Sequence, residues 1–235
     1  MLSSNFLLAS LSPADAASIQ PYLRRVELEH KKVLFEAGDK IGHVYFPTGA
    51  VISLVIGLST GEMVEAAMVG KDGVVGAASA LDGRMSLSRA IVQLAGPALV
   101  CDILELKGAA LQSHSPLAKL IRHEQTLYAQ AQQSAACMAA HEVQARLSRW
   151  LLRARDLSGS DTLTFTQEFL AEMLAVRRTS VTVVAHTLQQ AGLIKYSRGK
   201  IQIINIEGLR EAACECYESV KGHYALLLGD GSDDE

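Results

Sequence analysis

Hydrophobic and polar residues follow two different periods along the chain, and the change of period divides it. From Val26 to about Leu106, hydrophobic residues alternate with polar ones in short runs, and Gly, Pro, Asp and Ser separate the runs. Many short strands with regular turns are typical of an antiparallel sandwich or barrel. After Ser113 the period becomes that of amphipathic helices. We therefore predict an α+β protein whose N-terminal half is an antiparallel β-barrel.

A single long helix is predicted from residue 113 to residue 140. Ser115 is a suitable N-cap, and Pro116 suits the first helical position. An apolar stripe, interrupted at Glu124, continues for longer than one small barrel needs. We expect this helix to pair with a second copy of the chain; the alternative is an ordinary helix packed on its own barrel. The expected dimer interface consists of Leu117, Leu120, Ile121, Leu127, Tyr128, Ala131, Ala135 and Met138.

A shorter amphipathic helix is predicted over residues 141–156. Its apolar positions, which include Leu147 and Trp150, recur at helical spacing and should face inward. Its basic positions should face elsewhere; they are Arg146, Arg149 and Arg153. A loop rich in Ser and Gly at residues 158–161 should lead into the next unit.

Two more helical patterns lie close together within residues 164–193. Thr166 is a plausible N-cap for the first, with Glu168 in its first turn. The linker Ala175-Val176-Arg177 has the right length for a helix-turn-helix. The second pattern has an apolar inner stripe and a polar outer face, and Gly192 is placed to end it. The outer face suits the DNA major groove, because a guanidinium can bridge guanine O6 and N7 and a valine methyl can pack on thymine.

A hairpin with a basic tip is predicted directly after the second helix. Residues 193–197 and 200–204 have strand character, and Arg198-Gly199 separates them. A hairpin in this place is a wing, which reaches over the DNA backbone where positive charge acts on any sequence. The DNA-binding candidates are therefore Arg177, Arg178, Thr179, Ser180, Thr182, Val183, His186, Arg198 and Lys200.

The run L-A-E-M-L-A-V-R-R-T-S-V-T, followed by the helix and A-G-L-I, resembles the winged helix-turn-helix of the Crp/Fnr transcription regulators. The resemblance extends over the N-terminal half and implies the jelly roll of cyclic-nucleotide-binding domains there. It places Arg178 on the family's base-reading arginine. The chain departs from the family at Ala175, where Gly is usual in the turn. It also departs at Thr179, where a Glu often reads cytosine, and at Val183, where a second Arg often reads guanine.

The cyclic-nucleotide motif of the family is degraded here. In members that bind these ligands, a Gly-Glu pair holds the ribose and an Arg-Ser/Thr-Ala triplet pairs with the phosphate. The matching positions read Val75-Gly76-Ala77 and Ser88-Arg89-Ala90. Arg89 is one residue out of register, which in a strand points it to the opposite face. We expect a sensor domain that does not bind cyclic nucleotide; the effector-pocket candidates are Gly76, Ala77, Ser88 and Arg89.

The charge distribution fits a DNA-binding domain on an acidic body. The net charge is −3, but residues 141–210 carry ten Lys/Arg and six Asp/Glu, a net charge of +4, which leaves −7 for the remainder. The expected divisions are a sensor domain at 1–112, a dimerisation helix at 113–140, a winged helix-turn-helix domain at 141–222 and an acidic tail at 223–235. A last helix is expected from Glu207 to about Tyr217.

Other chemistry is weakly represented. No nucleophile with a base, acid pair or phosphate loop suggests an enzyme, and no apolar run approaches a membrane span. The N-terminus is not a convincing signal peptide. The chain has four cysteines without a CxxC pair, and Cys214 and Cys216, two apart, should face different directions. We therefore expect no metal and no cofactor, and reduced thiols in a cytoplasmic protein.

Two questions stay open at this point. Haem as a sensor ligand has three candidate histidines, His43, His114 and His123. The expected partners are double-stranded DNA, a second copy of the chain and RNA polymerase, with no membrane. The alternative is a protein-interaction module that resembles a cyclic-nucleotide-binding protein but lacks specific DNA binding.

Overall fold

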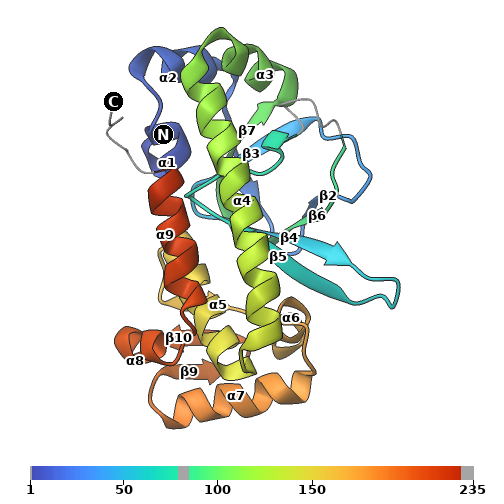
Figure 1. The fold of residues 1–235 in the computed structure, drawn as a ribbon, viewed down its shortest axis with the longest axis vertical. Helices are drawn as coiled ribbons and strands as arrows, with labels where there is room; N and C mark the ends of the chain where they lie inside the picture. The colour runs from blue at the N-terminus through green and yellow to red at the C-terminus, as the bar shows by residue number, and fades with distance from the viewer. Residues whose placement is uncertain (1, 79–84, 229–235) are drawn as a thin grey trace.

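The computed structural model describes residues 2–78 and 85–228 (Figure 1). Short helices open the chain: the 3-10 helix η1 (Leu2–Ser4), α1 (Phe6–Ala9), α2 (Pro13–Ile19) and the 3-10 helix η2 (Gln20–Tyr22). Ser12 caps α2 by accepting a hydrogen bond from Asp15 N, with Pro13 in the first turn. Seven strands follow among the described residues: β1 (Arg24–Leu28), β2 (Val33–Phe35), β3 (His43–Pro47), β4 (Val51–Gly57), β5 (Met63–Val69), β6 (Arg89–Leu94) and β7 (Gly96–Asp102).

These strands form two antiparallel sheets, with the orders β1-β7-β3 and β2-β6-β4-β5. The prediction of a barrel is wrong in one respect, because the described strands do not close on themselves. Strand β2, at one edge of its sheet, has only three residues, and its pairing with β6 shifts register. Small side chains such as Ala50, Ala90 and Ala98 are fully buried between the sheets. The N-terminal half is therefore an open sandwich that covers its apolar faces by packing sheet on sheet.

The long helix is present, with a different start. Helix α3 (Ile103–Gln112) precedes it, and α4 runs over His114–Ala140. Ser113, in extended conformation, takes the N-cap position, so Ser115 and Pro116 lie inside the first turn. The predicted cap at Ser115 is therefore wrong. Proline is tolerated at this place because the first turn leaves its N–H groups without helical partners.

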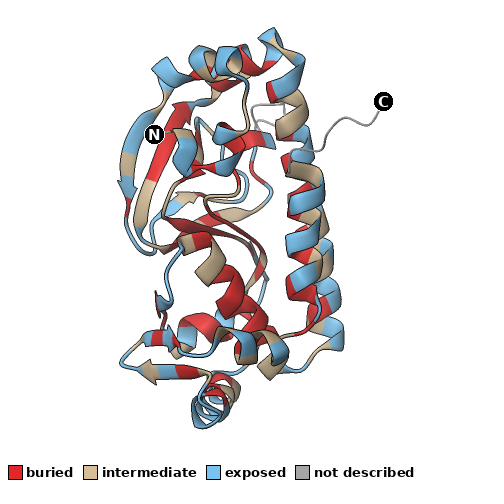
Figure 2. Ribbon diagram, turned by 90° about the vertical axis from the view of Figure 1, so that its left-hand side faces the viewer, coloured by how far each residue is buried: buried red, intermediate tan, exposed pale blue. Residues whose placement is uncertain are grey.

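Helix α5 (Val143–Ser158) opens the C-terminal domain and lies between the sandwich and the rest of that domain, and Figure 2 shows its buried residues beside those of the sheets. Met68 of β5 and Trp150 of α5 belong to the same buried cluster. The prediction that its arginines face away from the core is wrong, since at most 9% of Arg146, Arg149 and Arg153 is exposed. The cause is tertiary: a helix with a protein layer on both sides has no solvent face along most of its length.

The C-terminal domain continues with β8 (Thr162–Thr164), α6 (Gln167–Met173), α7 (Arg178–Gln190), β9 (Ile194–Ser197), β10 (Lys200–Ile203), α8 (Ile206–Glu211) and α9 (Cys216–Leu228). Strands β8, β10 and β9 form a third antiparallel sheet. In place of the single last helix predicted at 207–217 there are two helices. Asn205 caps α8, which ends at Glu211, and a short non-helical connection leads to α9. Within the described chain, no helix is long and apolar enough to cross a membrane.

Helix α9 lies beside α4 for much of its length (Figure 1). Val220 and Tyr224 are buried on its inner side. The part of the expected acidic tail at residues 223–228 is therefore helical, because these apolar residues have a neighbour to pack against. The remainder of that expected tail, 229–235, lies outside the described residues.

Candidate nucleic-acid interface

An aromatic cluster sets the position of the helix-turn-helix. The ring centroids of Trp150 and Phe165 are 4.7 Å apart, and those of Phe165 and Phe169 are 5.4 Å apart. Trp150 comes from α5 and Phe169 from α6, so the rings fix one helix against the other. The inner stripe of α7 is buried as its spacing predicts, at Val181, Ala185 and Leu188. The outer face of α7 is thereby turned to solvent.

The turn between α6 and α7 contains a residue in an unusual conformation. Ala175 has a φ of +50°, in the left-handed region. Its N–H donates to Glu172 O at 3.1 Å, and Val176 N–H donates to Ala171 O at 2.9 Å, which closes the turn. Glycine adopts this region without cost, whereas a Cβ is crowded there. Ala175 stands at a turn position where the resembled family has glycine, and the backbone shows why glycine suits it.

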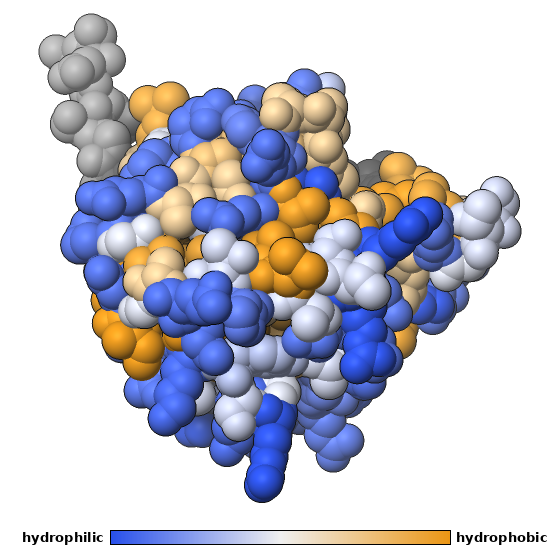
Figure 3. All heavy atoms as spheres, turned by 90° about the horizontal axis from the view of Figure 1, so that it is seen from below, coloured by the Kyte–Doolittle hydropathy of each residue, from blue (hydrophilic) through white to orange (hydrophobic). Residues whose placement is uncertain are grey.

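Most of the predicted DNA-reading residues lie together on the outer face of α7 or just before it. Ser180 is half-buried, and the others are exposed: Arg177, Arg178, Thr179, Thr182, Val183 and His186. Two of them contact α6, the first helix of the helix-turn-helix. Arg178 Nη1 lies 2.9 Å from Glu168 Oε1, and Thr182 Oγ1 donates to Gln167 Oε1 at 2.8 Å. Figure 3 shows the face that carries α7 from below, with hydrophilic side chains around a smaller hydrophobic area.

The hairpin after α7 is present as predicted. Gly192, at φ +71°, ends α7, and Ser197 pairs with Lys200 across a two-residue turn. Arg198 (φ +48°) and Gly199 (φ +76°) both have positive φ, the pattern of a type I′ turn. Arg198 and Lys200 are exposed, so the tip offers two cations beside the outer face of α7.

The four effector-pocket candidates differ in their surroundings. Ala77 is fully buried in the hydrophobic core, and Gly76 has a φ of +93°. Ser88 accepts a hydrogen bond from Ser86 through its carbonyl. Arg89 Nε donates to Glu36 Oε2 at 2.6 Å, while its neighbour Ala90 is buried between the sheets. The guanidinium therefore already has a carboxylate partner outside the sandwich interior.

The three candidate haem histidines occupy different environments. His43 and His114 are exposed. His123 is fully buried, and its Nε2 accepts a hydrogen bond from Val74 N at 3.1 Å. A hydrogen-bonded core histidine of this kind ties α4 to the sandwich.

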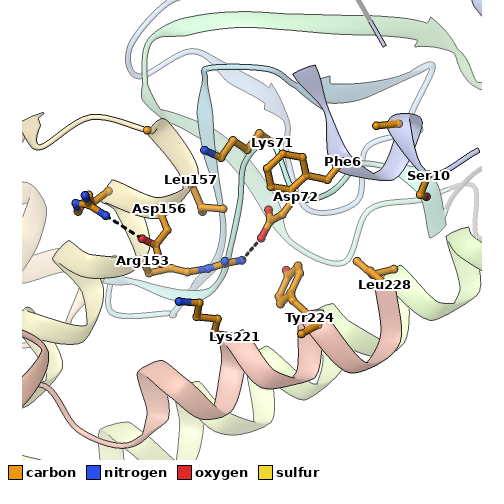
Figure 4. A pocket seen from close by; sticks show the side chains of 14 residues that line it. Phe6, Ser10, Lys71, Asp72, Arg153, Asp156, Leu157, Lys221, Tyr224 and Leu228 are labelled. Carbon is orange, nitrogen blue, oxygen red and sulfur yellow. Dashed lines mark hydrogen bonds and ion pairs between the residues drawn. The ribbon is translucent and has the colours of Figure 1, made fainter. Parts of the chain in front are cut away.

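A cavity of about 740 Å³ lies outside the predicted effector region, between α1, α5 and α9 (Figure 4). The Arg153 guanidinium lies 2.7 Å from Asp72 Oδ2 and 4.4 Å from the centre of the Tyr224 ring. Lys71 and Lys221 add positive charge to its lining. No pattern in the sequence indicates this cavity, because its walls come from segments up to about two hundred residues apart.

The residues expected at the dimer interface divide between two sides of α4. Leu120 is buried in its own chain, so it is not available to a partner, and Leu127 is half-buried against the sandwich. Ile121, Tyr128 and Ala135 are exposed. Leu117, Ala131 and Met138 are half-buried. A single stripe was expected because hydrophobicity does not reveal which side the chain itself covers.

The two C-terminal cysteines point to the same place, and the expectation that they face different directions is wrong. Cys214 lies in the connection between α8 and α9, and Cys216 begins α9, so the angular rule for residues two apart in a helix does not apply. Both are buried in one cluster with Cys137.

Comparisons with known proteins agree with this geometry. The model of the Crp-like helix-turn-helix domain matches residues 145–212. FixK2 from Bradyrhizobium japonicum has a TM-score of 0.70 at 14% identity, over 82% of this chain and 98% of that one. A CRP-family transcriptional regulator from Thermus thermophilus has a TM-score of 0.67 at 21% identity, over 81% and 96%.

A third structure, a transcriptional regulator of the Crp/Fnr family from Eubacterium rectale, has a TM-score of 0.66 at 17% identity, over 89% of this chain and 98% of that one. No curated protein matches the chain. At these identities the solved structures show a shared fold, whereas the domain model identifies the helix-turn-helix itself. The chain therefore contains a Crp-like helix-turn-helix domain, within a fold that is similar to that of these transcription regulators.

Proposed function

We propose that the protein binds, as a homodimer, an inverted-repeat operator. The observation that carries this proposal is the exposed outer face of α7 with the basic wing tip beside it. A helix end with exposed arginine and hydroxyl side chains fits the major groove, and cations at a hairpin tip fit the phosphates next to it.

The free side of α4 supports the dimer. Positions spaced alternately three and four residues apart stay unburied along it, as in a coiled-coil seam. They are Ala118, Ile121, Gln125, Tyr128, Gln132, Ala135 and Ala139. The small alanines at the C-terminal end let two helices approach closely. Two recognition helices related by this axis would enter successive major grooves about 34 Å apart.

Base reading is assigned to α7. Arg178, at its first turn, reads a guanine once it leaves the exposed Glu168 carboxylate, a contact worth at most about 1 kcal/mol. Thr179, Thr182, Val183 and His186 supply weaker or methyl contacts. Ser180, half-buried, supports the face. Because Val183 stands where the family often has a second arginine, we expect a half-site richer in A·T pairs than that of the catabolite activator. Arg177, Arg198 and Lys200 contact phosphates.

The sensor domain is expected to respond to a signal other than a cyclic nucleotide. A cyclic phosphate needs a cation. Among the candidate residues Ala77 is buried and uncharged, and the Arg89 guanidinium is already paired with Glu36. Calorimetry with cyclic AMP and cyclic GMP should show no micromolar binding. The dimer on its operator is expected to act through RNA polymerase.

The decisive experiment is selection from random DNA, with retardation of genomic fragments at two salt concentrations. We expect an enriched inverted repeat and binding that weakens steeply with salt. Tyr128→Asp should give a monomer in light scattering and lose the operator complex. Tyr22→Asp is the matched control, since Tyr22 is exposed on the short N-terminal helix η2. Recovery of no motif, with no retardation at low salt, would favour a protein-interaction module instead.

A further inference from the structure

Four potential metal ligands from distant parts of the chain converge at one point. The ligand atoms of Cys137, His141, Cys214 and Cys216 all lie within 4.8 Å of one another. Cys137 Sγ is 3.5 Å from Cys214 Sγ, and Cys216 Sγ is 3.6 Å from His141 Nδ1. In a tetrahedral zinc site, bonds of about 2.3 Å to sulfur and about 2.0–2.1 Å to nitrogen imply edges of about 3.8 Å and 3.6 Å. The observed spacings are close to both values.

Neighbouring polar side chains contact two of these four residues in the way that supporting groups contact the ligands of a metal site. His141 turns Nδ1 toward Cys216 Sγ, and its Nε2 lies 3.1 Å from Glu215 Oε1. A carboxylate on the second ring nitrogen fixes the tautomer and leaves the first nitrogen free to ligate. Gln133 Nε2 donates to Cys216 Sγ at 3.0 Å, a contact that stabilises a thiolate. A cluster assembled only by hydrophobic packing does not need either contact.

We propose that Cys137, His141, Cys214 and Cys216 bind one zinc ion as a closed structural site. Three thiolates and one imidazole favour a soft or borderline divalent cation over calcium or magnesium. The three cysteines are at most 7% exposed, so solvent is excluded from their side of the site. Zinc replaces the thiol protons, which are released to solvent, and no oxidant is required.

The site lies where a structural ion affects geometry between the domains. Cys137 is in the last turn of α4, and only His141 and Glu142 separate α4 from α5. Cys214 precedes α9 and Cys216 is its first residue, and α9 lies beside α4. Zinc therefore ties α9 to the hinge between the seam of α4 and the DNA-binding domain. This last consequence rests on the proposed function, whereas zinc binding itself does not.

The first test is metal content. The chain is expressed in zinc-supplemented medium, purified under reducing conditions, and analysed by elemental mass spectrometry. We expect about one zinc per chain in the wild type, loss of zinc in Cys137→Ser and Cys214→Ser, and retention in Cys101→Ser. Cys101 is the matched control because it is a buried cysteine in β7, outside this cluster. A wild type without zinc would overturn the proposal.

A second measurement on the unmutated chain guards against variants that fail to fold. Replacement of zinc by Co²⁺ should give the visible absorption of tetrahedral cobalt bound by thiolates. Glu215→Gln should keep this spectrum but bind the ion about 10–100-fold more weakly. Absence of the spectrum, or a Cys137–Cys214 disulfide without metal in freshly isolated protein, would overturn the site.

The coupling to DNA is tested separately. Chelation of zinc should lower the melting temperature and weaken operator binding, and added zinc should restore both. If zinc binds but chelation leaves DNA affinity unchanged, the ion does not act on the hinge, although the site stands. If zinc binds and no DNA is ever bound, the proposed function fails and the site again stands.

Discussion

Helices α5 and α7 lie in the same domain and both carry arginines, but the two sets of arginines have opposite surroundings. On α5, Arg146, Arg149 and Arg153 are buried, and Arg153 lies 2.7 Å from Asp72 in the loop after β5. At the start of α7, Arg177 and Arg178 are exposed. The difference shows that Arg153 on α5 joins this domain to the sandwich, whereas the arginines at the start of α7 face solvent, where Arg178 pairs with the exposed Glu168.

The contrast also changes how the charge of the domain is understood. Three of the ten basic residues counted in residues 141–210 are the buried arginines of α5. Two of these arginines donate hydrogen bonds to backbone carbonyls inside the protein: Arg146 donates to Leu174 O, and Arg153 donates to Met68 O. The cations that DNA can contact are therefore concentrated at α7 and the wing. The net charge of the domain overstates the number of positive charges available to DNA, because it includes the buried arginines.

The largest expected effect comes from the buried side of this comparison. Arg153→Ala leaves the Asp72 carboxylate, 13% exposed, without its partner, and should lower the free energy of unfolding by about 3–5 kcal/mol. Urea denaturation of wild type and variant measures it. Arg177→Ala is the control on the exposed side and should change stability by less than about 0.5 kcal/mol. Equal losses in both variants would remove the distinction between the two helices.

The second prediction concerns Glu65 of β5, which joins the sandwich to α5 by accepting a hydrogen bond from Trp150 Nε1 at 2.8 Å. Burial raises the pKa of this carboxyl from 4.5 to about 7, although Ser53, Arg149 and Trp150 oppose the shift. A raised folded-state pKa means that the folded protein holds the proton more tightly. The contribution of Glu65 to stability is therefore fully present below about pH 4.5, is lost as the pH rises to about 7, and does not change further above that.

The measurement is the pH dependence of unfolding in wild type and Glu65→Gln. Between pH 4.5 and 7 the variant should gain about 3 kcal/mol relative to the wild type, because glutamine carries no charge to desolvate. Glu62→Gln serves as the control, since Glu62 is exposed in the loop before β5. Parallel curves for Glu65→Gln and wild type would show that the carboxyl titrates normally.

The third prediction concerns the exposed side. Arg178→Ala should cost about 1–3 kcal/mol of operator binding and relax preference at one base pair per half-site. Arg177→Ala should weaken all sequences alike and lower the salt slope by about one. Random-sequence selection with each variant separates the two roles. If wild type and Arg178→Ala recover the same motif with equal information at every position, Arg178 is not the reader.

The sequence predicted those features that depend on neighbouring residues. Thr166 caps α6, Gly192 ends α7, and the Arg198-Gly199 turn closes the wing, since each depends on local backbone preference. The predictions failed where contacts join segments that are far apart in the sequence. The burial of Arg153 depends on Asp72, and the cysteine cluster depends on a connection that brings Cys214 to Cys137. Neither pairing leaves a periodic signal along the chain.

The smallest expected effect tests whether the turn that aims α7 is strained. Ala175 is exposed and has a φ of +50°, so its Cβ costs about 1–2 kcal/mol, while glycine would add backbone entropy to the unfolded chain worth about 0.5–1 kcal/mol. Ala175→Gly should therefore stabilise the protein by up to about 1 kcal/mol. Ala191→Gly is the matched control: Ala191 is also exposed but has a φ of −74°, so only the entropy term remains and the variant should be less stable. Thermal unfolding of both variants gives the comparison, and a loss of stability in Ala175→Gly would show that the left-handed turn carries no strain for glycine to relieve.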